Sequence, residues 1–240
     1  MKNYFITATD TDAGKTFVAS ALICALVKEN KRIAAYKPVA AGCQEQNGVL
    51  VNEDAALLAF FSNCSQDIPS VNPIALIEAI APHIAAAHAE YEISLGEINK
   101  GFEEVLSLHA DINVTEGAGG WRLPLSFNDA TYNNQPTYLS DFAKASKQDV
   151  ILIVNMKLGC LNHALLTYQA IIADGLNCIA WVANSANVEP MSNLKENIAS
   201  LEKLLPMPKI AQFEYFQDTA MSLHEKISVA AKMIDITPFK

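Results

Sequence analysis

The sequence feature that most constrains the fold is the run 8–16, which reads ATDTDAGKT. It follows a strand-like apolar stretch at 4–8 and precedes a helical pattern over 17–28. A loop between a strand and a helix is the setting that a phosphate-binding loop needs, because its amides and the helix N-terminus then face the anion. The run therefore predicts a phosphate site on an α/β fold.

Three residues at the end of this run have the chemistry that phosphate binding uses. Gly14 lets the backbone come close to phosphate oxygens, Lys15 supplies a positive charge, and the hydroxyl of Thr16 is a ligand for Mg²⁺. The usual motif has a further glycine where this chain has Thr9, which follows Ala8. An ordinary helix start that reads Gly-Lys-Thr is the alternative interpretation.

The rest of the chain alternates apolar runs with helical patterns, which predicts a mostly parallel sheet with helices on both faces. Further strands are expected at 33–36, 112–116, 150–154 and 178–183, and helices at 53–61, 95–108, 161–174, 192–205 and 219–234. We expect one P-loop NTPase-like domain over 1–240, because 51% of the residues are apolar and no linker or repeat divides the chain. The polar segment 122–136, with Asn133 and Asn134 near its end, is expected to be a surface loop beside the site.

Charge and cysteine content narrow the functional class. The chain has 17 basic and 26 acidic residues, a net charge of −9, which argues against nonspecific nucleic-acid binding. Its five cysteines are scattered without a CxxC pair, which is typical of reduced thiols in the cytoplasm. No secretory signal is recognised, and no apolar run approaches the roughly 20 residues of a membrane-spanning helix. We therefore expect a cytoplasmic protein that binds neither nucleic acid nor membrane.

Charged residues near the ends of expected strands form a second group of candidates. Parallel strands end at one edge of a sheet, so Lys37 and Glu116 are expected near the phosphate loop. Glu116 precedes a glycine-rich turn and Asp54 lies near the start of a helix, and both are candidate Mg²⁺ ligands. The alternatives are a solvated strand-end acid for Glu116, a first-turn acid favoured by the helix dipole for Asp54, and a surface lysine for Lys37.

Two further segments follow expected strands. The run 157–163 joins a strand to a helix, and its exposed amides are able to bind a substrate carboxylate. Asn184 follows the strand at 178–183, and its amide is able to read a nucleotide base. A plain strand-to-helix turn and an ordinary turn asparagine are the respective alternatives.

Taken together, these segments resemble the dethiobiotin synthetase family, the ATP-dependent carboxylating and ring-closing enzymes of biotin synthesis. The matching stretches are Thr9–Thr11 with Gly14–Thr16, Tyr36–Ala40, Asn72-Pro73, Pro82-His83, Glu116–Trp121, Lys157–Cys160 with Asn162–Ala164, and Trp181–Asn184. They cover roughly the first three quarters of the chain in the family's order, which is more specific than the phosphate loop alone.

The resemblance implies a homodimer with a P-loop fold whose substrates are 7,8-diaminononanoate, CO₂ or bicarbonate, and MgATP. One amine of the diamine takes up CO₂ to form a carbamate, and a carbamate oxygen then attacks the γ-phosphate. The second amine closes the ureido ring of dethiobiotin and expels phosphate, and ADP is the other product.

Roles for individual residues also follow from the resemblance. Lys15, Lys37 and Thr11 are the implied catalytic residues. The implied nucleotide contacts are Asp12, Ala13, Gly14, Lys15, Thr16, Phe17, Glu116 and Asn184, of which Asn184 reads adenine. The implied Mg²⁺ ligands are Thr16, Asp54 and Glu116. The implied substrate contacts are Thr11, Lys37 and Ala41, with Gly159, Cys160 and Asn162 supplied by the neighbouring subunit.

The chain departs from the family pattern at several positions. Ala8 stands in place of a glycine, so its methyl group crowds the turn if that residue needs a positive φ. Asp12 replaces a glutamate, and Ala41 replaces a serine and so lacks one hydroxyl contact. The stretch 211–214 lacks the family's proline-containing nucleotide segment, so base preference is less constrained than phosphate binding.

Two other functional classes remain open from the sequence. A partitioning or targeting ATPase that switches by nucleotide-dependent dimerisation shares the broad P-loop group. Such proteins typically have an extra lysine early in a glycine-rich loop, where this chain has Ala8 and Thr9. A catalytically inactive nucleotide-binding scaffold is the third possibility, although Lys15, Thr16 and both candidate acids are present.

Overall fold

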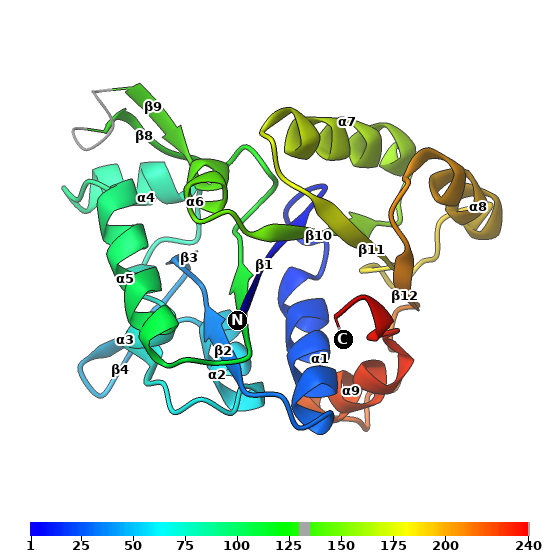
Figure 1. Cartoon of the computed structure of the whole chain (residues 1–240), viewed down its shortest axis with the longest axis horizontal. Coiled ribbons are helices and arrows are strands. Elements are labelled where there is room, and N and C mark those ends of the chain that lie inside the picture. The colour runs from blue at the N-terminus through cyan, green and yellow to red at the C-terminus, as the bar shows by residue number, and fades with distance from the viewer. Residues whose placement is uncertain (130–134, 240) are drawn as a thin grey trace.

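The core of the fold is a six-stranded sheet in which every neighbouring pair of strands is parallel. A computed structural model describes residues 1–129 and 135–239 (Figure 1). The strand order is β12-β11-β10-β1-β7-β2, so β1 lies inside the sheet. The strands are β1 (Lys2–Ala8), β2 (Ile33–Tyr36), β7 (Ile112–Glu116), β10 (Asp149–Asn155), β11 (Cys178–Asn184) and β12 (Lys209–Phe213). The predicted parallel sheet is confirmed.

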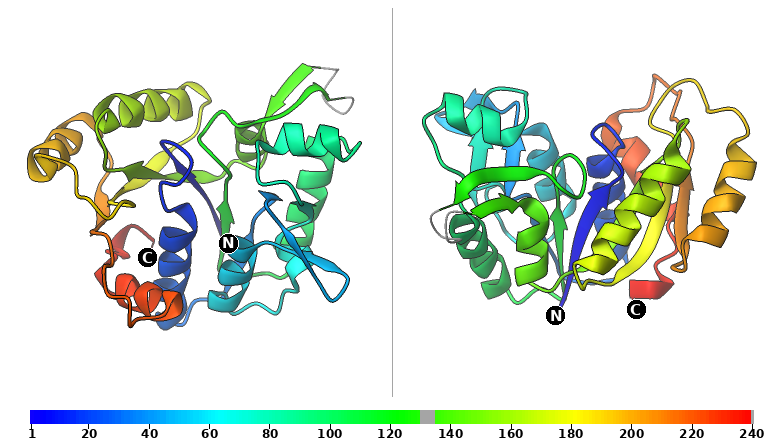
Figure 2. Two further views of the ribbon diagram at one scale, coloured as in Figure 1. Left: turned by 180° about the vertical axis from the view of Figure 1, so that it is seen from behind. Right: turned by 90° about the horizontal axis from the view of Figure 1, so that it is seen from above.

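Helices cover both faces of this sheet, as predicted. One face carries α1 (Lys15–Lys28), α2 (Glu53–Phe61) and α9 (Leu223–Ala230). The other carries α5 (Leu95–Ser107), α6 (Leu139–Ala145), α7 (Cys160–Ala173) and α8 (Leu194–Leu204). Within β1, Ile6 joins the first core and Phe5 the second, because successive strand side chains point to opposite faces. Figure 1 and Figure 2 show α7 and α1 on opposite sides of β10 and β11.

Shorter elements flank the main sheet. They are α3 (Ile68–Val71), α4 (Pro82–His88), the parallel pair β3 (Val39–Ala41) and β6 (Ile74–Leu76), and the antiparallel pair β4 (Gln44–Gln46) and β5 (Val49–Val51). A second antiparallel pair is β8 (Pro124–Asp129) with β9 (Gln135–Tyr138), and two 3-10 turns cover Ala231–Met233 and Thr237–Phe239. The helix α4, the helix α6 and the strand β12 were not among the predicted elements.

The prediction of a surface loop over 122–136 is wrong for most of that segment. Its residues form the strand β8 and the first part of β9, and Leu125 is buried. Phe127 lies edge-on to the ring of His83 in α4, with 5.4 Å between the ring centroids. Pairing between two short strands and packing on α4 therefore order a sequence whose composition resembles a loop. Asn133 and Asn134 lie outside the described residues.

Two predicted helices begin later than expected. The helix α8 starts at Leu194, two residues after the predicted start. The helix α9 starts at Leu223, because Ser222 accepts a hydrogen bond from the amide of Glu225 at 3.3 Å and the Glu225 carboxylate accepts one from the amide of Ser222 at 2.8 Å. After Ala230 the chain continues as a 3-10 turn.

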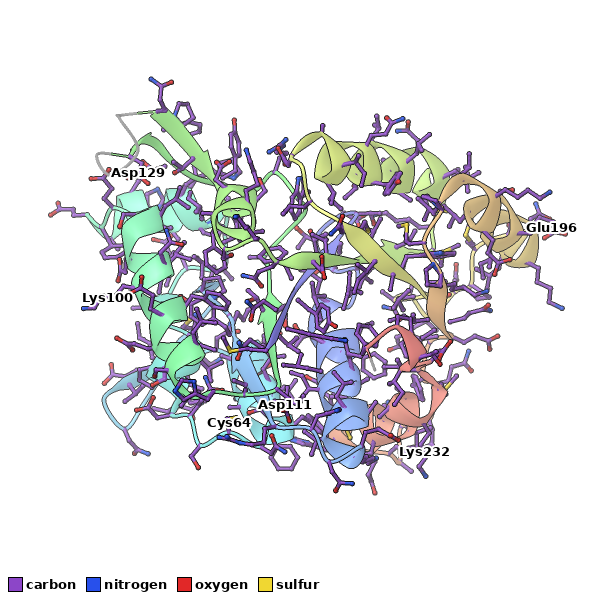
Figure 3. All side chains as sticks on the ribbon, viewed as in Figure 1. Cys64, Lys100, Asp111, Asp129, Glu196 and Lys232 are labelled. Carbon is purple, nitrogen blue, oxygen red and sulfur yellow. The ribbon has the colours of Figure 1, made fainter. Side chains whose placement is uncertain are left out.

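Charged side chains are distributed unevenly over the structure. Figure 3 shows Lys100, Glu196 and Lys232 on the outer helices and the turn after α9, and all three are exposed. Lys15 of the phosphate loop, Lys37 after β2 and Glu116 at the end of β7 are instead buried. Among the described helices, none is both long enough and apolar enough to cross a membrane.

Candidate functional site

A cavity of about 960 Å³ opens at the edge of the sheet where β1, β7 and β11 end. This is the edge at which parallel α/β folds bind ligands. Of the residues predicted for the site, those that line the cavity are Thr11, Asp12, Gly14, Lys15, Thr16, Phe17, Lys37, Ala41, Asp54, Glu116 and Asn184. The fold therefore brings together residues from five separate parts of the sequence.

The phosphate loop is held in shape by its glycine and by Asn184. Gly14 has a φ of 80° and precedes the first residue of α1. A Cβ on Gly14 would lie 2.3 Å from Nδ2 of Asn184 and would displace that amide, and the positive φ itself disfavours any other residue. That Nδ2 donates a hydrogen bond to the carbonyl oxygen of Ala13 at 2.8 Å. Ala13, which was also predicted as a nucleotide contact, is buried and does not line the cavity.

Ala8 closes β1 without strain. It is buried and lacks the positive φ that would make its methyl group unfavourable. The following amide, that of Thr9, donates to the carbonyl oxygen of Ile153 in β10 at 3.0 Å. The crowding expected from this replacement of glycine therefore does not occur.

Lys15 lies almost buried at the start of α1. Its side chain is directed into the loop, where Nζ donates to the carbonyl oxygen of Gly119 at 2.7 Å and to that of Asp10 at 3.3 Å. Burial lowers the pKa of Lys15, and nearby Glu116 only partly opposes this shift. Since both of these acceptors are neutral backbone oxygens, no direct ion pair in the described structure competes with an incoming anion for this ammonium group.

A second cluster lies beside it, centred on Glu116. Oε1 of Glu116 accepts hydrogen bonds from the Thr16 hydroxyl at 2.9 Å and from Nζ of Lys37 at 2.8 Å. Lys37 also lies 3.3 Å from Oδ2 of Asp54. Both Lys37 and Glu116 are nearly inaccessible to solvent. One buried ammonium group therefore holds two carboxylates at the end of the phosphate loop.

Burial and mutual attraction act in opposite directions on these groups. Burial alone would lower the pKa of Lys37, but attraction to Glu116 and Asp54 outweighs it and raises the pKa. Burial is the main reason that the pKa of Glu116 is raised, despite the attraction of Lys37. The neutral form of Glu116 is thus less disfavoured than in a solvent-exposed carboxyl group.

Two asparagines position this cluster. Oδ1 of Asn52 accepts from the amide of Asp54 at 3.1 Å and so caps α2, while its Nδ2 donates to the carbonyl oxygen of Ala41 at 3.2 Å. Nδ2 of Asn72 donates to the carbonyl oxygen of Lys37 at 2.8 Å. Asp54 is therefore both a first-turn acid and a partner of Lys37, so its two interpretations are compatible.

The oxygen donors of this cluster fit Mg²⁺. Thr16, Asp54 and Glu116 supply one hydroxyl and two carboxylates, the hard oxygen ligands that Mg²⁺ takes beside phosphate oxygens and water. Oε2 of Glu116 is buried and has no hydrogen-bond partner in the described structure. The described residues contain no cluster of three or more histidine, cysteine or acidic side chains suited to a metal.

The other end of the cavity is lined by aromatic side chains. The ring of Phe17 lies 5.6 Å from that of Phe213 and 5.4 Å from that of Phe216. Tyr215 and Lys226 also line this end, and Nζ of Lys226 donates to the carbonyl oxygen of Phe216 at 3.2 Å. Apart from Phe17, the sequence did not predict these residues, because no local motif connects them to the phosphate loop.

Three predicted substrate residues lie outside the cavity. Gly159, with a φ of 94°, precedes α7, and Cys160 is its first residue. The Cys160 side chain is buried in the core and burial raises the pKa of its thiol, whereas Asn162 is exposed. Asn162 and the turn before α7, in which Leu158 is 95% exposed, are thus accessible to another molecule, whereas the Cys160 side chain is not.

Comparisons with known proteins agree on one family. A family profile described as an AAA domain matches residues 2–221. The ATP-dependent dethiobiotin synthetase BioD of Alteromonas mediterranea is 47% identical over 220 residues, which are 90% of this chain and 93% of that protein. The proteins of the same name from Pseudoalteromonas translucida and Pseudomonas aeruginosa UCBPP-PA14 are 44% and 41% identical, over 91% and 93% of this chain and 92% and 96% of their own lengths.

Solved structures with low sequence identity share the fold. A ParA family ATPase from Chlorobium tepidum has a TM-score of 0.53 at 12% identity, over 100% of this chain and 94% of that one. The MinC:MinD cell division protein complex from Aquifex aeolicus has a TM-score of 0.51 at 12% identity, over 96% of this chain and 86% of that one. These likenesses establish the P-loop NTPase-like architecture alone.

Proposed function

The chain belongs to the ATP-dependent dethiobiotin synthetase family, and on that premise we propose that it forms dethiobiotin from 7,8-diaminononanoate, CO₂ and ATP, as a cyclo-ligase. The observation that carries the proposal is the cluster of Lys15, Thr16, Lys37, Asp54 and Glu116 around one cavity. These side chains are placed to bind a triphosphate at one end and a second anion beside it.

The proposed chemistry balances without a redox step. One neutral amine of the diamine attacks CO₂ and loses a proton, which gives a carbamate. A carbamate oxygen attacks the γ-phosphorus and ADP leaves, so a carbamic-phosphoric anhydride forms. The second amine then attacks the carbamate carbon, loses a proton and expels phosphate, which closes the ureido ring.

Lys15 is proposed to act on the phosphates. Its ammonium group is nearly buried and bonded to the carbonyl oxygens of Asp10 and Gly119. A positive charge in such surroundings stabilises negative charge that develops during phosphoryl transfer more than it would in water. The amides of Asp12, Ala13 and Gly14 are proposed to bind the same phosphates.

Mg²⁺ is proposed to bind at Thr16, Asp54 and Glu116. When bound, this ion would neutralise charge on the phosphate oxygens and help to orient them. The protein holds the two carboxylates in place through Lys37, whose Nζ lies 2.8 Å from Oε1 of Glu116 and 3.3 Å from Oδ2 of Asp54.

Lys37 and Thr11 are proposed to contact the carbamate end of the substrate. Both line the cavity, as does Ala41, which has no hydroxyl to offer. Lys37 keeps its charge in the buried cluster, because its pKa is raised by its two acidic neighbours. A buried ammonium group is suited to bind a carbamate while leaving the substrate amines free.

The remaining proposed contacts are those of a second subunit with the substrate and those of Asn184 with the nucleotide base. In a homodimer, the turn with Gly159, Cys160 and Asn162 would meet the substrate carboxylate of the neighbouring site. Asn184 would read the adenine amino group, because its Nδ2 is already bonded to Ala13 and leaves Oδ1 as the acceptor. The five free cysteines are all buried, which fits the proposed cytoplasmic setting.

The test is phosphate release from ATP with and without the diamine and bicarbonate. The proposal predicts release that requires both additions, together with formation of dethiobiotin. Release that depends on DNA or lipid would favour the switch-type ATPase, and the absence of release under all conditions would favour an inactive scaffold.

A further inference from the structure

The phosphate loop contains two acids, Asp10 and Asp12, within a segment that has to bind an anion. Asp12 is exposed, lines the cavity and has a φ of 58°. Asp10 does not line the cavity, but its side chain is only 23% exposed and its backbone oxygen accepts a hydrogen bond from Lys15. An uncompensated carboxylate so close to the phosphate site would repel a triphosphate.

One cation lies directly against Asp10. Nζ of Lys157, in the turn between β10 and α7, contacts Oδ2 of Asp10. The Lys157 side chain is 41% exposed, and its residue follows β10, the strand that neighbours β1. The pair therefore joins the phosphate loop to the turn that precedes Gly159.

The second oxygen of Asp10 is also held. The Thr9 hydroxyl donates to Oδ1 of Asp10 at 3.0 Å, and it accepts from the amide of Asn155 at 3.2 Å. This arrangement fixes the carboxylate to β10 on one side and to Lys157 on the other. Thr9, at the position where the usual motif has glycine, thus has a role in orienting the acid.

We propose that Lys157 is a positioning residue of the nucleotide site, which neutralises Asp10 and keeps that carboxylate turned away from the bound phosphates. The inference rests on the proposed function only in taking ATP as the nucleotide. Lys157 acts through Asp10 and does not itself touch the nucleotide. Loss of the Lys157 ammonium group should therefore weaken nucleotide binding only while Asp10 is charged.

The test is a double-mutant cycle read by calorimetric binding of ATP with Mg²⁺, without diamine or bicarbonate. In Lys157→Met we expect binding about tenfold weaker than in the parent, because an unpaired carboxylate then faces the phosphates. In Asp10→Asn with Lys157→Met we expect affinity within about twofold of Asp10→Asn alone. The defect of Lys157→Met should also shrink as salt is raised, because ions screen the repulsion.

A matched control and the opposing outcomes make the test decisive. Lys209→Met removes another paired lysine, whose Nζ lies 2.6 Å from Oε1 of Glu202, and should leave ATP affinity unchanged. Unchanged affinity in Lys157→Met, or a double variant as weak as that single variant, would overturn the inference; the latter would indicate direct contact of Lys157 with the phosphates. If the parent protein itself did not bind ATP, that result would contradict the proposed function.

Discussion

At the phosphate end of the cavity Lys15 is 8% exposed and Glu116 1%, whereas at the base end Tyr215 is 42% exposed and Leu223 46%. The phosphate end is a network of short contacts between groups fixed at strand ends and at the start of α1. The other end, where the base is proposed to bind, is formed by Asn184 at the end of β11, the segment after β12 and α9, and its contacts include those of the Phe17 ring with Phe213 and Phe216.

This difference has an energetic consequence. A buried charge that loses its partner is costly, because neither water nor a neighbour compensates it, whereas a half-exposed aromatic contact contributes less. We therefore expect substitutions at the phosphate end to affect catalysis strongly and substitutions at the base end to affect mainly nucleotide affinity.

The largest effect is expected from Lys15→Ala. Loss of the buried ammonium group should lower the rate of phosphate release by about a thousandfold or more, because charge on the transferring phosphoryl group is no longer stabilised. Circular dichroism and Tm should show that the fold is intact. Lys28→Ala, which removes an exposed lysine from the last turn of the same helix, is the control and should keep full activity. Unchanged turnover in Lys15→Ala would remove Lys15 from its role.

The next effect is expected from Glu116→Gln. The amide keeps the size of the side chain but loses the charge for Mg²⁺ and for Lys37, so activity should fall by about a hundredfold. A titration of phosphate release with Mg²⁺ should show a higher requirement for the ion. Glu103→Gln on the exposed surface of α5 is the control. An unaltered Mg²⁺ requirement would contradict the assignment of Glu116 as a ligand.

A smaller effect is expected from Asn184→Ala at the base end. The KM for ATP should rise about tenfold while kcat changes little, since one hydrogen bond to the base and the bond to Ala13 are lost. Discrimination between ATP and GTP should fall as well. Asn197→Ala, on an exposed face of α8, is the matched control. A decrease confined to kcat would show that Asn184 acts in the catalytic step, and it would contradict the expectation that the base end affects mainly nucleotide affinity.

The smallest effect is expected from Phe216→Leu. The centroid of its ring lies 5.4 Å from that of Phe17, and an aromatic pair of this kind contributes about 1 kcal/mol. The KM for ATP should therefore rise by no more than about fivefold, with kcat unchanged, in steady-state kinetics. An effect as large as that of Glu116→Gln would show that the base end is as tightly organised as the phosphate end.

The phosphate end could be predicted from the sequence to a large extent, for a physical reason. In a parallel sheet the strand ends share one edge, so Lys37 and Glu116 were expected beside Lys15 although they lie far apart in the chain. The cap at Asn52 follows a local rule, because asparagine is a preferred residue immediately before a helix. The contact between Asp10 and Lys157 has no local signature, since it depends on how two loops approach each other.

The base end and the hairpin of β8 and β9 were less predictable. The partners of Phe17 come from β12 and the segment after it, and β12 itself was not predicted because its five residues lack a clear pattern. The hairpin has a loop-like composition and depends on packing against α4. The roles of Gly159, Cys160 and Asn162 rested on the resemblance and on the exposed amides expected in a strand-to-helix turn, and the three residues lie outside the cavity of their own chain.

The most direct test of the account is the fate of oxygen from CO₂. With ¹⁸O-labelled bicarbonate, diamine and MgATP, the phosphate released in a short reaction should carry one labelled oxygen, because the carbamate oxygen attacks phosphorus and leaves with it. Mass spectrometry of the phosphate gives the result, with labelled water as the reciprocal control. Phosphate whose new oxygen comes from water would show simple hydrolysis and contradict the proposed reaction.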